Sequence, residues 1–228
     1  MSNFSPVESA LKRNRVVTYA ASSAATPFDV LRTKIVLQMR KNGWKRLAIT
    51  SPNPGCGKTT MCCNLTVGLS RQPDIRTILF ELDLRKPAVA KMLGHAPGAD
   101  ITEMLTGKVA FGEQAMRLRE NVAFSIANRP TPDPMRYLLS EETDQHLRVI
   151  EGTYQPDLMI FDLPPILAAD DTRAVLSKVD CALIVIRSEK TTVAQIDACE
   201  REIAEHTNVL GMVVNQCRFP DSAGYEDY

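Results

Sequence analysis

The sequence has no surplus of either charge. Its 228 residues include 27 lysines and arginines and 27 aspartates and glutamates, so the formal net charge at pH 7 is zero. Proteins that bind DNA or RNA usually carry a basic surplus that attracts the phosphate backbone. The charge balance gives no support to nucleic-acid binding, and we expect no nucleic-acid partner.

The sequence also lacks a long apolar stretch. About 20 consecutive apolar residues are needed to span a bilayer, and the longest runs here, "LMIF" and "CALIVI", have the length of strands. The opening "MSNFSPVESALKRNR" lacks the apolar core of a secretory signal. We therefore expect a cytoplasmic protein without a membrane span, which reaches the inner face of the plasma membrane only through a partner.

Closely spaced metal ligands are missing as well. The six cysteines include no CxxC pair and the three histidines are scattered, so we expect no structural zinc site. In a reducing cytosol all six cysteines should be thiols. Cys181 and Cys199 lie in apolar patterns that predict small core residues. Cys62 and Cys63 are neighbours on a predicted helix, where their side chains diverge, which opposes a disulfide.

The sequence does contain a regular alternation of strands and helices. Strand patterns occur at "RLAIT", "RTILFEL", "NVAFSIA", "DLMIFD", "CALIVIR" and "VLGMVV". Strands that are apolar on both faces suit a parallel sheet covered by helices. The pattern predicts an α/β fold with a doubly wound, mainly parallel sheet flanked by helices. Ligands of such sheets bind at the carboxyl ends of the strands.

The chain divides into three parts by composition. Residues 1–25 form an N-terminal lead-in whose basic stretch "ALKRNR" is typical of a solvated helix face, with contact to an acidic membrane surface or a partner as the alternative. Residues 26–216 contain all the strand patterns named above and form one domain. Residues 217–228 form a polar tail that contains Tyr225 and Tyr228.

Helix signals place several boundaries inside the domain. Thr26 can cap a first helix that ends at Gly43. The segment "MRYLLSEETDQHLRVIEG" has helical periodicity, and Asp100 can cap the short helix "ITEML". The stretch "TTVAQIDACEREIAEH" predicts an amphipathic helix with Val193 on its apolar side.

The stretch "TSPNPGCGKTT" follows the first strand and predicts a phosphate-binding loop. The P-loop pattern ends in Gly-Lys-Ser/Thr, and Gly57, Lys58 and Thr59 match it, although Pro52 occupies the first glycine position. Backbone N–H groups at a helix N-terminus can surround an anion, the lysine can bridge the β- and γ-phosphates, and the Thr59 hydroxyl can bind Mg²⁺. The candidate nucleotide-binding residues are Pro54, Gly55, Cys56, Gly57, Lys58, Thr59 and Thr60.

Two further strands end in carboxylates. In "ILFELDLRKP" the strand is followed by Glu81, Asp83 and Arg85, which a period of two places on one side. In "LMIFDLPPIL" an apolar strand ends in Asp162, the Walker B arrangement that orients Mg²⁺. A salt-bridged strand terminus is the alternative for the first group. Beside a P-loop, a metal, base or phosphate-binding role is favoured.

Two single residues leave their roles open. Asn215 follows the last strand, and its amide can pair with the edge of a purine or close the strand as a turn residue. Cys56 lies inside the predicted P-loop, where it is either a plain filler or a thiol made oxidation-sensitive by a lysine and a helix N-terminus.

Taken together, these motifs resemble the bacterial tyrosine kinase (BY-kinase) family of capsule and exopolysaccharide synthesis. The resemblance extends from about Thr26 to Gln216 and includes "SPNPGCGKTT", "FELDLRKP", "RPTPDPMRYLLS", "DLPPIL", "VIRSEKTTVAQI" and "NVLGMVVN". It implies the parallel P-loop fold related to the MinD/ParA ATPases. The combination of motifs is more specific than a single P-loop.

The resemblance also implies an activity, cofactors and partners. ATP and Mg²⁺ would be bound by Lys58 and Thr59, with Asp83 and Asp162 completing the metal site. Glu81 stands where the family usually has an aspartate that is proposed to accept the proton of the attacking tyrosine. The family autophosphorylates tyrosines of its C-terminal tail, typically between neighbours in a homo-oligomeric ring. A membrane polysaccharide co-polymerase activates it, here implied to be a separate chain.

Some positions differ from the family pattern and keep a second hypothesis open. The oligomerisation helix usually reads Glu-x-x-Arg-x-x-Arg, where this sequence has Thr26, Asp29 and Arg32, and the tail holds only two tyrosines. These differences, with glutamate at position 81, favour a nucleotide-gated interaction protein of the same fold with little kinase activity. A partition ATPase is a third alternative, which Asn53 opposes because those proteins have a lysine at that position.

Overall fold

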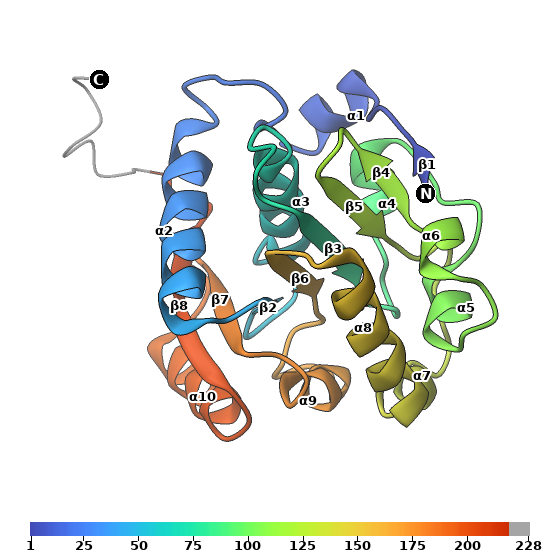
Figure 1. The fold of residues 1–228 in the computed structure, drawn as a ribbon. Helices are drawn as coiled ribbons and strands as arrows, with labels where there is room; N and C mark the ends of the chain where they lie inside the picture. Colours follow the sequence, from blue (N-terminus) through green and yellow to red (C-terminus); the bar gives the residue numbers. More distant parts are fainter. Residues whose placement is uncertain (219–228) are drawn as a thin grey trace.

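The computed structural model describes residues 1–218, and its strands form one eight-stranded sheet in the order β1-β4-β5-β3-β6-β2-β7-β8 (Figure 1). Neighbouring strands are parallel except for the antiparallel pair β4 and β5. The expected doubly wound, mainly parallel sheet is therefore confirmed. The strands are β1 Ser2–Asn3, β2 Arg46–Thr50, β3 Thr77–Glu81, β4 Met116–Leu118, β5 Val122–Ser125, β6 Leu158–Asp162, β7 Cys181–Arg187 and β8 Asn208–Asn215.

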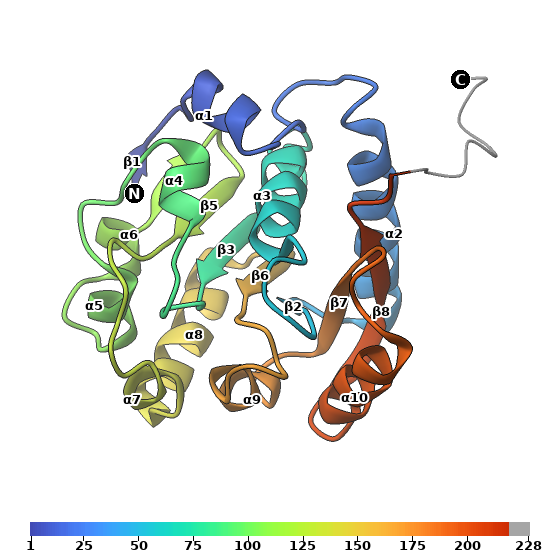
Figure 2. The same cartoon turned by 180° about the vertical axis from the view of Figure 1, so that it is seen from behind.

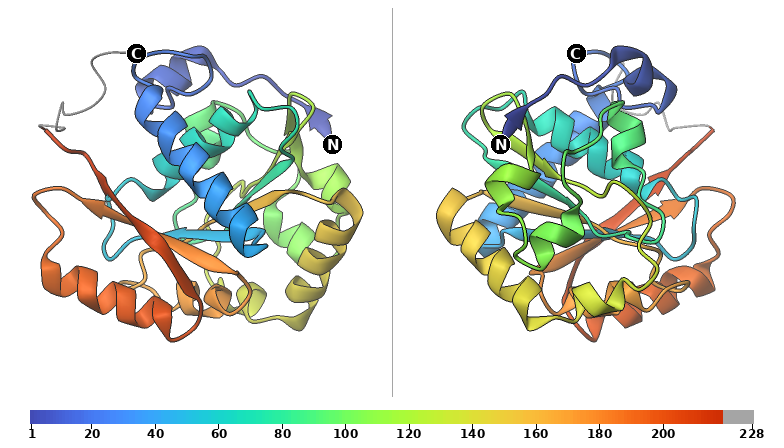
Figure 3. Two further views of the ribbon diagram at one scale, coloured as in Figure 1. Left: turned by 60° about the vertical axis from the view of Figure 1, so that its left-hand side comes forward. Right: turned by 90° about the vertical axis from the view of Figure 1, so that its right-hand side faces the viewer.

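Helices cover both faces of this sheet (Figures 2 and 3). One apolar core lies between the sheet and α1 to α4, and a second lies between the sheet and α5 to α10. The helices are α1 Glu8–Arg13, α2 Thr26–Asn42, α3 Lys58–Leu69, α4 Val89–Leu93, α5 Ile101–Leu105, α6 Phe111–Gln114, α7 Met135–Leu138, α8 Glu141–Tyr154, α9 Asp171–Leu176 and α10 Val193–Ala204. No helix among residues 1–218 is long and apolar enough to cross a membrane.

The N-terminal lead-in packs onto the domain. Phe4, Leu11 and Val16 are buried in the first core, and the Phe4 ring stacks on His95 with 5.3 Å between centroids. The two-residue strand β1 lengthens the sheet by pairing with β4. Apolar residues at 4, 11 and 16 thus anchor the basic helix α1 in the fold, and its lysine and arginines face solvent.

Two local predictions are wrong. The segment "MRYLLSEETDQHLRVIEG" forms two helices, because Ser140 leaves the helical conformation and its hydroxyl caps α8 by accepting from the N–H of Glu142. The first-domain helix begins at Thr26 itself, and its N-cap is Ala25. A capping hydrogen bond therefore sets the start of α8, whereas α2 starts without a side-chain cap. Gly43, in the left-handed conformation, ends this helix as expected.

The apolar side of α10 is narrower than its sequence pattern predicts. Cys199 and Ile203 are buried and Ile196 is half-buried, whereas the side chain of Val193 is 72% exposed. Val193 is the first residue of α10, directly after the capping residue Thr192. Strand β4, which pairs with β5 in a hairpin, was also absent from the prediction, because its three residues are too few for a periodicity signal.

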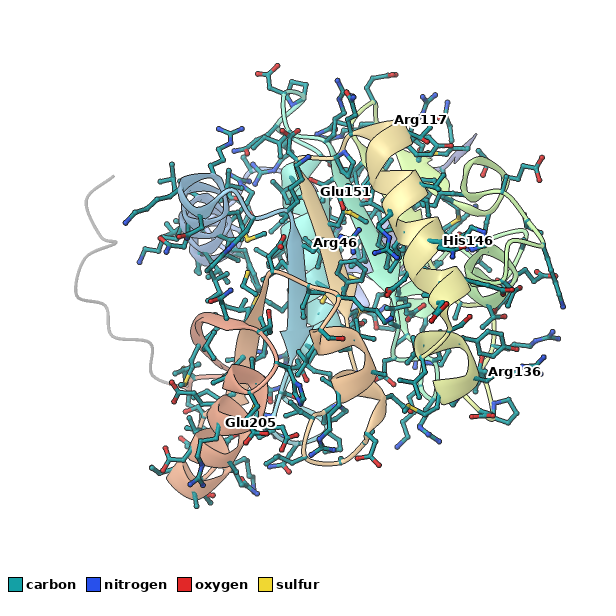
Figure 4. The ribbon with its side chains drawn as sticks, turned by 60° about the horizontal axis from the view of Figure 1, so that its bottom comes forward. Arg46, Arg117, Arg136, His146, Glu151 and Glu205 are labelled. Carbon is teal, nitrogen blue, oxygen red and sulfur yellow. The ribbon has the colours of Figure 1, made fainter. Side chains whose placement is uncertain are left out.

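The amino edge of the sheet is held by ion pairs. The guanidinium of Arg46, the first residue of β2, points toward Glu151 of α8 (Figure 4), and Arg46 Nη2 lies 2.7 Å from Glu151 Oε2. The carboxylate of Asp180 accepts the backbone N–H groups of Lys45 and Arg46 at 2.8 Å each. These bonds fix the start of the central strand whose other end leads into the predicted P-loop.

Candidate nucleotide-binding site

The predicted P-loop lies between the carboxyl end of β2 and the start of α3. Gly55 and Gly57 have φ values of 80° and 93°, the left-handed region that glycine tolerates. Within the described chain, no backbone carbonyl accepts a hydrogen bond from the N–H groups of residues 55–60. These unpaired donors surround the N-terminus of α3, where the helix dipole also favours an anion. The loop thus fits a phosphate group.

A second layer of amides supports this loop from β8. Asn215 Nδ2 donates to the carbonyl of Cys56 at 2.8 Å, and Gln216 Nε2 donates to the carbonyl of Gly55 at 3.0 Å. A Cβ added to Gly57 would lie 2.2 Å from Asn215 Nδ2, so only glycine fits there. The amide nitrogen of Asn215 is therefore engaged with the loop backbone, a contact that neither of its two predicted roles included.

Lys58 opens α3 and lies close to two carboxylates. Its side chain is buried, and its ammonium opposes the burial-driven rise of the pKa of both Asp83 and Asp162. Lys58 has no ion-pair partner within 4.0 Å among the described residues. Burying an ammonium without a close partner costs free energy unless an anion such as phosphate pairs with it.

Asp162 has the features of a metal ligand. It is fully buried at the end of β6, which raises the pKa of its carboxyl to about 6, and the nearby Lys58 ammonium and Thr59 hydroxyl oppose this rise. Its Oδ1 accepts from the thiol of Cys62 at 3.5 Å, whereas its Oδ2 is buried and has no hydrogen-bond partner among residues 1–218. An orphaned carboxylate oxygen beside a hydroxyl and a second carboxylate matches the oxygen ligands that Mg²⁺ prefers.

Glu81 lies next to Asp162 across β3 and β6, yet its carboxylate is occupied by backbone donors. Its Oε1 accepts the N–H groups of Ala88 and Val89 at 2.6 and 2.8 Å, and its Oε2 accepts the N–H of Ala127 at 3.0 Å. Burial raises the pKa of Glu81 to about 7, opposed by the backbone hydrogen bonds. Glu81 therefore joins the start of α4 to the segment after β5.

Asp83 and Arg85 leave the strand that contains Glu81. β3 ends at Glu81, and a turn closed by the N–H of Lys86 on the carbonyl of Asp83 follows. The period of two therefore does not extend to these residues. Asp83 is half-buried, whereas the guanidinium of Arg85 turns to the buried carboxylate of Asp171 and donates to its Oδ1 at 3.0 Å.

A cavity of about 260 Å³ opens beside the P-loop on the side of β3 and β6. Asp83 and Lys58 face it together with the double-proline turn after β6. Its walls comprise Pro54, Gly55, Lys58, Asp83, Arg85, Lys86, Pro164, Pro165, Ala168 and Ala169. Glu81 and Asp162 are fully buried and are absent from these walls. The cavity gives an outside group access to Lys58 and Asp83.

A second pocket, of about 320 Å³, flanks the other side of the P-loop. It is lined by Arg15, Arg187, Ser188, Glu189, Lys190, Gln216, Cys217 and Arg218. Sequence reasoning missed its basic residues. Arg187 and Lys190 lie in the stretch "VIRSEK", which is part of the family resemblance and could have pointed to them. Arg15 is far away in the sequence, and no sequence pattern connects it with this pocket.

Cys56 is buried, and its thiol donates to the carbonyl of Asn53 at 3.2 Å. Oxidation-sensitive thiols need solvent access as well as a positive neighbourhood. The position of Cys56 thus favours the filler interpretation. All six cysteines are free thiols, as expected.

Comparison with known proteins identifies the relatives of this chain. No family model matches the sequence. The tyrosine-protein kinase YwqD of Bacillus subtilis is 28% identical over 222 residues, which cover 96% of this chain and 93% of YwqD. The tyrosine-protein kinase Wzc of Salmonella typhimurium is 28% identical over 203 residues, 87% of this chain. The chain is therefore similar in sequence to bacterial proteins that are named tyrosine-protein kinases.

The lengths of the bacterial tyrosine kinase relatives differ. The chain matches YwqD over nearly its whole length but spans only 27% of Wzc. Among solved structures, the kinase domain of Escherichia coli ETK superposes with a TM-score of 0.77 at 23% identity, over 90% of this chain and 80% of that one. The VpsO kinase domain superposes with a TM-score of 0.75 at 23% identity, over 90% and 98%. These likenesses establish the shared fold.

Helix α2 faces the core at Arg32. Arg32 is buried, forms an ion pair with Asp29 at 2.7 Å and donates to the carbonyl of Gly68 at 3.2 Å. Arg71 also pairs with Asp29. These contacts bind α2 to α3. The acceptor candidates Tyr225 and Tyr228 lie outside the described residues.

Proposed function

We propose that this chain is an ATP-dependent protein-tyrosine autokinase that regulates exopolysaccharide or capsule export. The observation that supports this most is the open ring of backbone N–H groups at residues 55–60, next to an unpaired Lys58 and the orphaned oxygen of Asp162. Its curated relatives are named tyrosine-protein kinases. A related fold, cobyrinic acid a,c-diamide synthase from Mycobacterium smegmatis, contains an ATP analogue and magnesium.

The geometry supports the following roles. Pro54, Gly55, Cys56 and Gly57 of the loop and Lys58, Thr59 and Thr60 of α3 hold the phosphates of ATP. Thr59, Asp83 and Asp162 supply oxygen ligands for Mg²⁺, which neutralises charge on the transferred phosphoryl group when bound. Phosphoryl transfer depends mainly on such positioning and charge neutralisation. The cavity at Lys58 and Asp83 admits the acceptor tyrosine.

Arg85 and Glu81 act on the shape of this cavity. Arg85 holds the buried carboxylate of Asp171 and so attaches the turn after β3 to α9. Glu81 fixes the start of α4 and the segment after β5. In the autokinase, the proton of the tyrosine passes either to Glu81 after a rearrangement or to Asp83, which already faces the cavity.

The buried state of Glu81 favours the second candidate function, a nucleotide-gated interaction protein with little kinase activity. In that case ATP binding changes the association with a membrane co-polymerase, and no phosphate reaches the tail. Both functions place the chain at the inner face of the membrane through this partner, alone or as a homo-oligomer.

Intact-mass measurement after incubation with Mg-ATP tests the proposal. The mass of the autokinase should rise in steps of about 80 Da, one step for each phosphate added. Peptide mapping should then place the phosphates on Tyr225 or Tyr228. The measurement is repeated with the cytoplasmic tail of a co-polymerase present. ATP binding without any added phosphate in both conditions would instead establish the interaction protein.

A further inference from the structure

Two residues after the first helix, α1, an arginine has an unusual backbone conformation. Arg15 has a φ of 57°. Its N–H donates to the carbonyl of Lys12 at 3.2 Å, and the N–H of Val16 donates to the carbonyl of Leu11 at 2.9 Å. This pair of bonds is a Schellman motif, in which the left-handed residue is usually glycine. An arginine is strained there, so its side chain calls for an explanation.

The backbone around Arg15 is attached to the P-loop helix. Asn64 of α3 is fully buried, and its Nδ2 donates to the carbonyl of Arg15 at 2.9 Å. Asn64 Oδ1 accepts the N–H of Val17 at 2.8 Å, and the hydroxyl of Thr18 donates to the carbonyl of Asn64 at 2.7 Å. Because α3 begins at Lys58, these bonds fix the place of Arg15 relative to the phosphate-binding loop.

The side chain of Arg15 lines the second pocket together with Arg187 and Lys190. Within residues 1–218 none of these three cations has an ion-pair partner, and Glu189, the only carboxylate in the pocket wall, lies 3.4 Å from Arg218. The pocket borders the P-loop, since a Cβ at Gly55 would lie 3.8 Å from Arg187 Nη1. A concave, positively charged surface next to a phosphate-binding loop suits a polyanion.

We propose that Arg15 is a nucleotide-binding residue that adds positive charge from the N-terminal segment to the pocket of ATP. The inference rests on the proposed function in one respect, namely that the P-loop binds a nucleoside triphosphate. It extends that function by making residues 15–18 part of the nucleotide site. Nucleotide binding and docking of this segment then stabilise each other.

The substitution Arg15→Gly removes the charged side chain without straining the backbone. Glycine accepts the left-handed conformation, so the variant should melt at or above the temperature of the unchanged chain. We expect calorimetric titration of the full chain with Mg-ATP to give about tenfold weaker binding, as for loss of one charged hydrogen bond. Arg15→Lys should lose less affinity for Mg-ATP than Arg15→Gly. Arg13→Ala, the same loss of charge two residues away and outside the pocket, should change affinity less than about twofold.

Adenosine and hydrogen exchange give two further readouts. Adenosine lacks phosphates, so its affinity should be equal in the unchanged chain and in Arg15→Gly. ATP should slow amide exchange at Val17, whose N–H is bonded to Asn64, and should do so much less in the glycine variant.

Three outcomes would overturn the inference. Equal ATP affinity in the unchanged chain and Arg15→Gly rejects it and leaves the proposed function intact. If ATP affinity is equal but phosphate on Tyr225 or Tyr228 falls, the pocket binds the acidic tail "YEDY" instead. If the unchanged chain binds no ATP at all, the proposed function itself fails and this inference fails with it.

Discussion

At the amino edge of the sheet Arg46 pairs with Glu151, and Lys178 pairs with Asp144 at 2.8 Å. At the carboxyl edge, by contrast, Lys58 lies near two carboxylates, and in the part of the chain that the structure describes it has no close ion pair and one oxygen of Asp162 has no hydrogen-bond partner. The residue types are the same at the two edges. Paired side chains stabilise the fold, whereas a buried carboxylate oxygen without a partner beside an open phosphate-binding loop is a candidate metal ligand.

The open N–H groups of the P-loop belong to the same contrast. At the amino edge Asp180 accepts the backbone N–H groups that start β2, so that edge offers no free donors there. At the carboxyl edge the donors of residues 55–60 point from the start of α3 without a backbone acceptor in the described chain. The amino end of β2 is thus anchored by side-chain acceptors, whereas its carboxyl end leaves donors open for the proposed nucleotide.

The largest expected effect is that of Lys58→Met. Removing the buried ammonium should weaken Mg-ATP binding by about 10- to 100-fold, because a charged hydrogen bond contributes about 1.5–3 kcal/mol. Phosphotyrosine should disappear from the intact-mass spectrum. Lys45→Met at the amino edge, where Lys45 lies 4.0 Å from Glu151, is the matched control and should bind ATP normally. Phosphotyrosine in Lys58→Met would refute the site.

Asp162→Asn should raise the stability of the fold at high pH while weakening metal binding. The folded state holds the proton of Asp162 more tightly than the unfolded state, since burial raises its pKa from 3.8 to about 6. The stability from this group is therefore full below pH 3.8 and is lost as the pH rises through 6. Asparagine avoids this loss, on the order of 2–3 kcal/mol at pH 8.

Melting curves of the ligand-free protein at pH 5 and pH 8 test this expectation. The variant should exceed the unchanged chain more at pH 8 than at pH 5, and Mg²⁺ should no longer strengthen its ATP binding. A variant that is less stable at pH 8 would contradict the assignment of Asp162 as an incomplete metal ligand.

Glu81→Asp tests how the two carboxylates at the carboxyl edge differ. The shorter side chain cannot keep all the bonds to Ala88, Val89 and Ala127, so we expect a loss of about 1–3 kcal/mol in the free energy of unfolding. Chemical denaturation measures this loss, and intact mass measures phosphorylation in the same sample. A rise in phosphorylation would indicate that the carboxylate at 81 accepts the proton. Unchanged stability would contradict its structural role.

Glu151→Gln should have the smallest effect. Glu151 and Arg46 are 27% and 14% exposed, so solvent screens their ion pair only in part. We expect a loss of about 1 kcal/mol in the free energy of unfolding. ATP affinity, measured by titration, should stay unchanged. A clear fall in ATP affinity would show that the two edges are coupled and would contradict a purely anchoring role of the amino edge.

Much of this protein could be predicted because its signals are local. Long apolar strands predict the parallel sheet, and the sequence from Gly55 to Thr60 predicts the P-loop. Asp162 was predictable because it ends an apolar strand. The break between two helices at Ser140 and the exposure of Val193 were missed, since capping bonds and helix starts override the average periodicity of a segment.

The sequence by itself determined the strand order in the chain, the phosphate-binding loop and the carboxylates at the strand ends, because each depends on neighbours a few residues away. Only the tertiary structure decided that Glu81 is tied to three backbone donors and that Arg85 faces Asp171. It also brought Arg15 to the P-loop through Asn64. Contacts between residues far apart in the chain are set by packing of the elements, which no local pattern encodes.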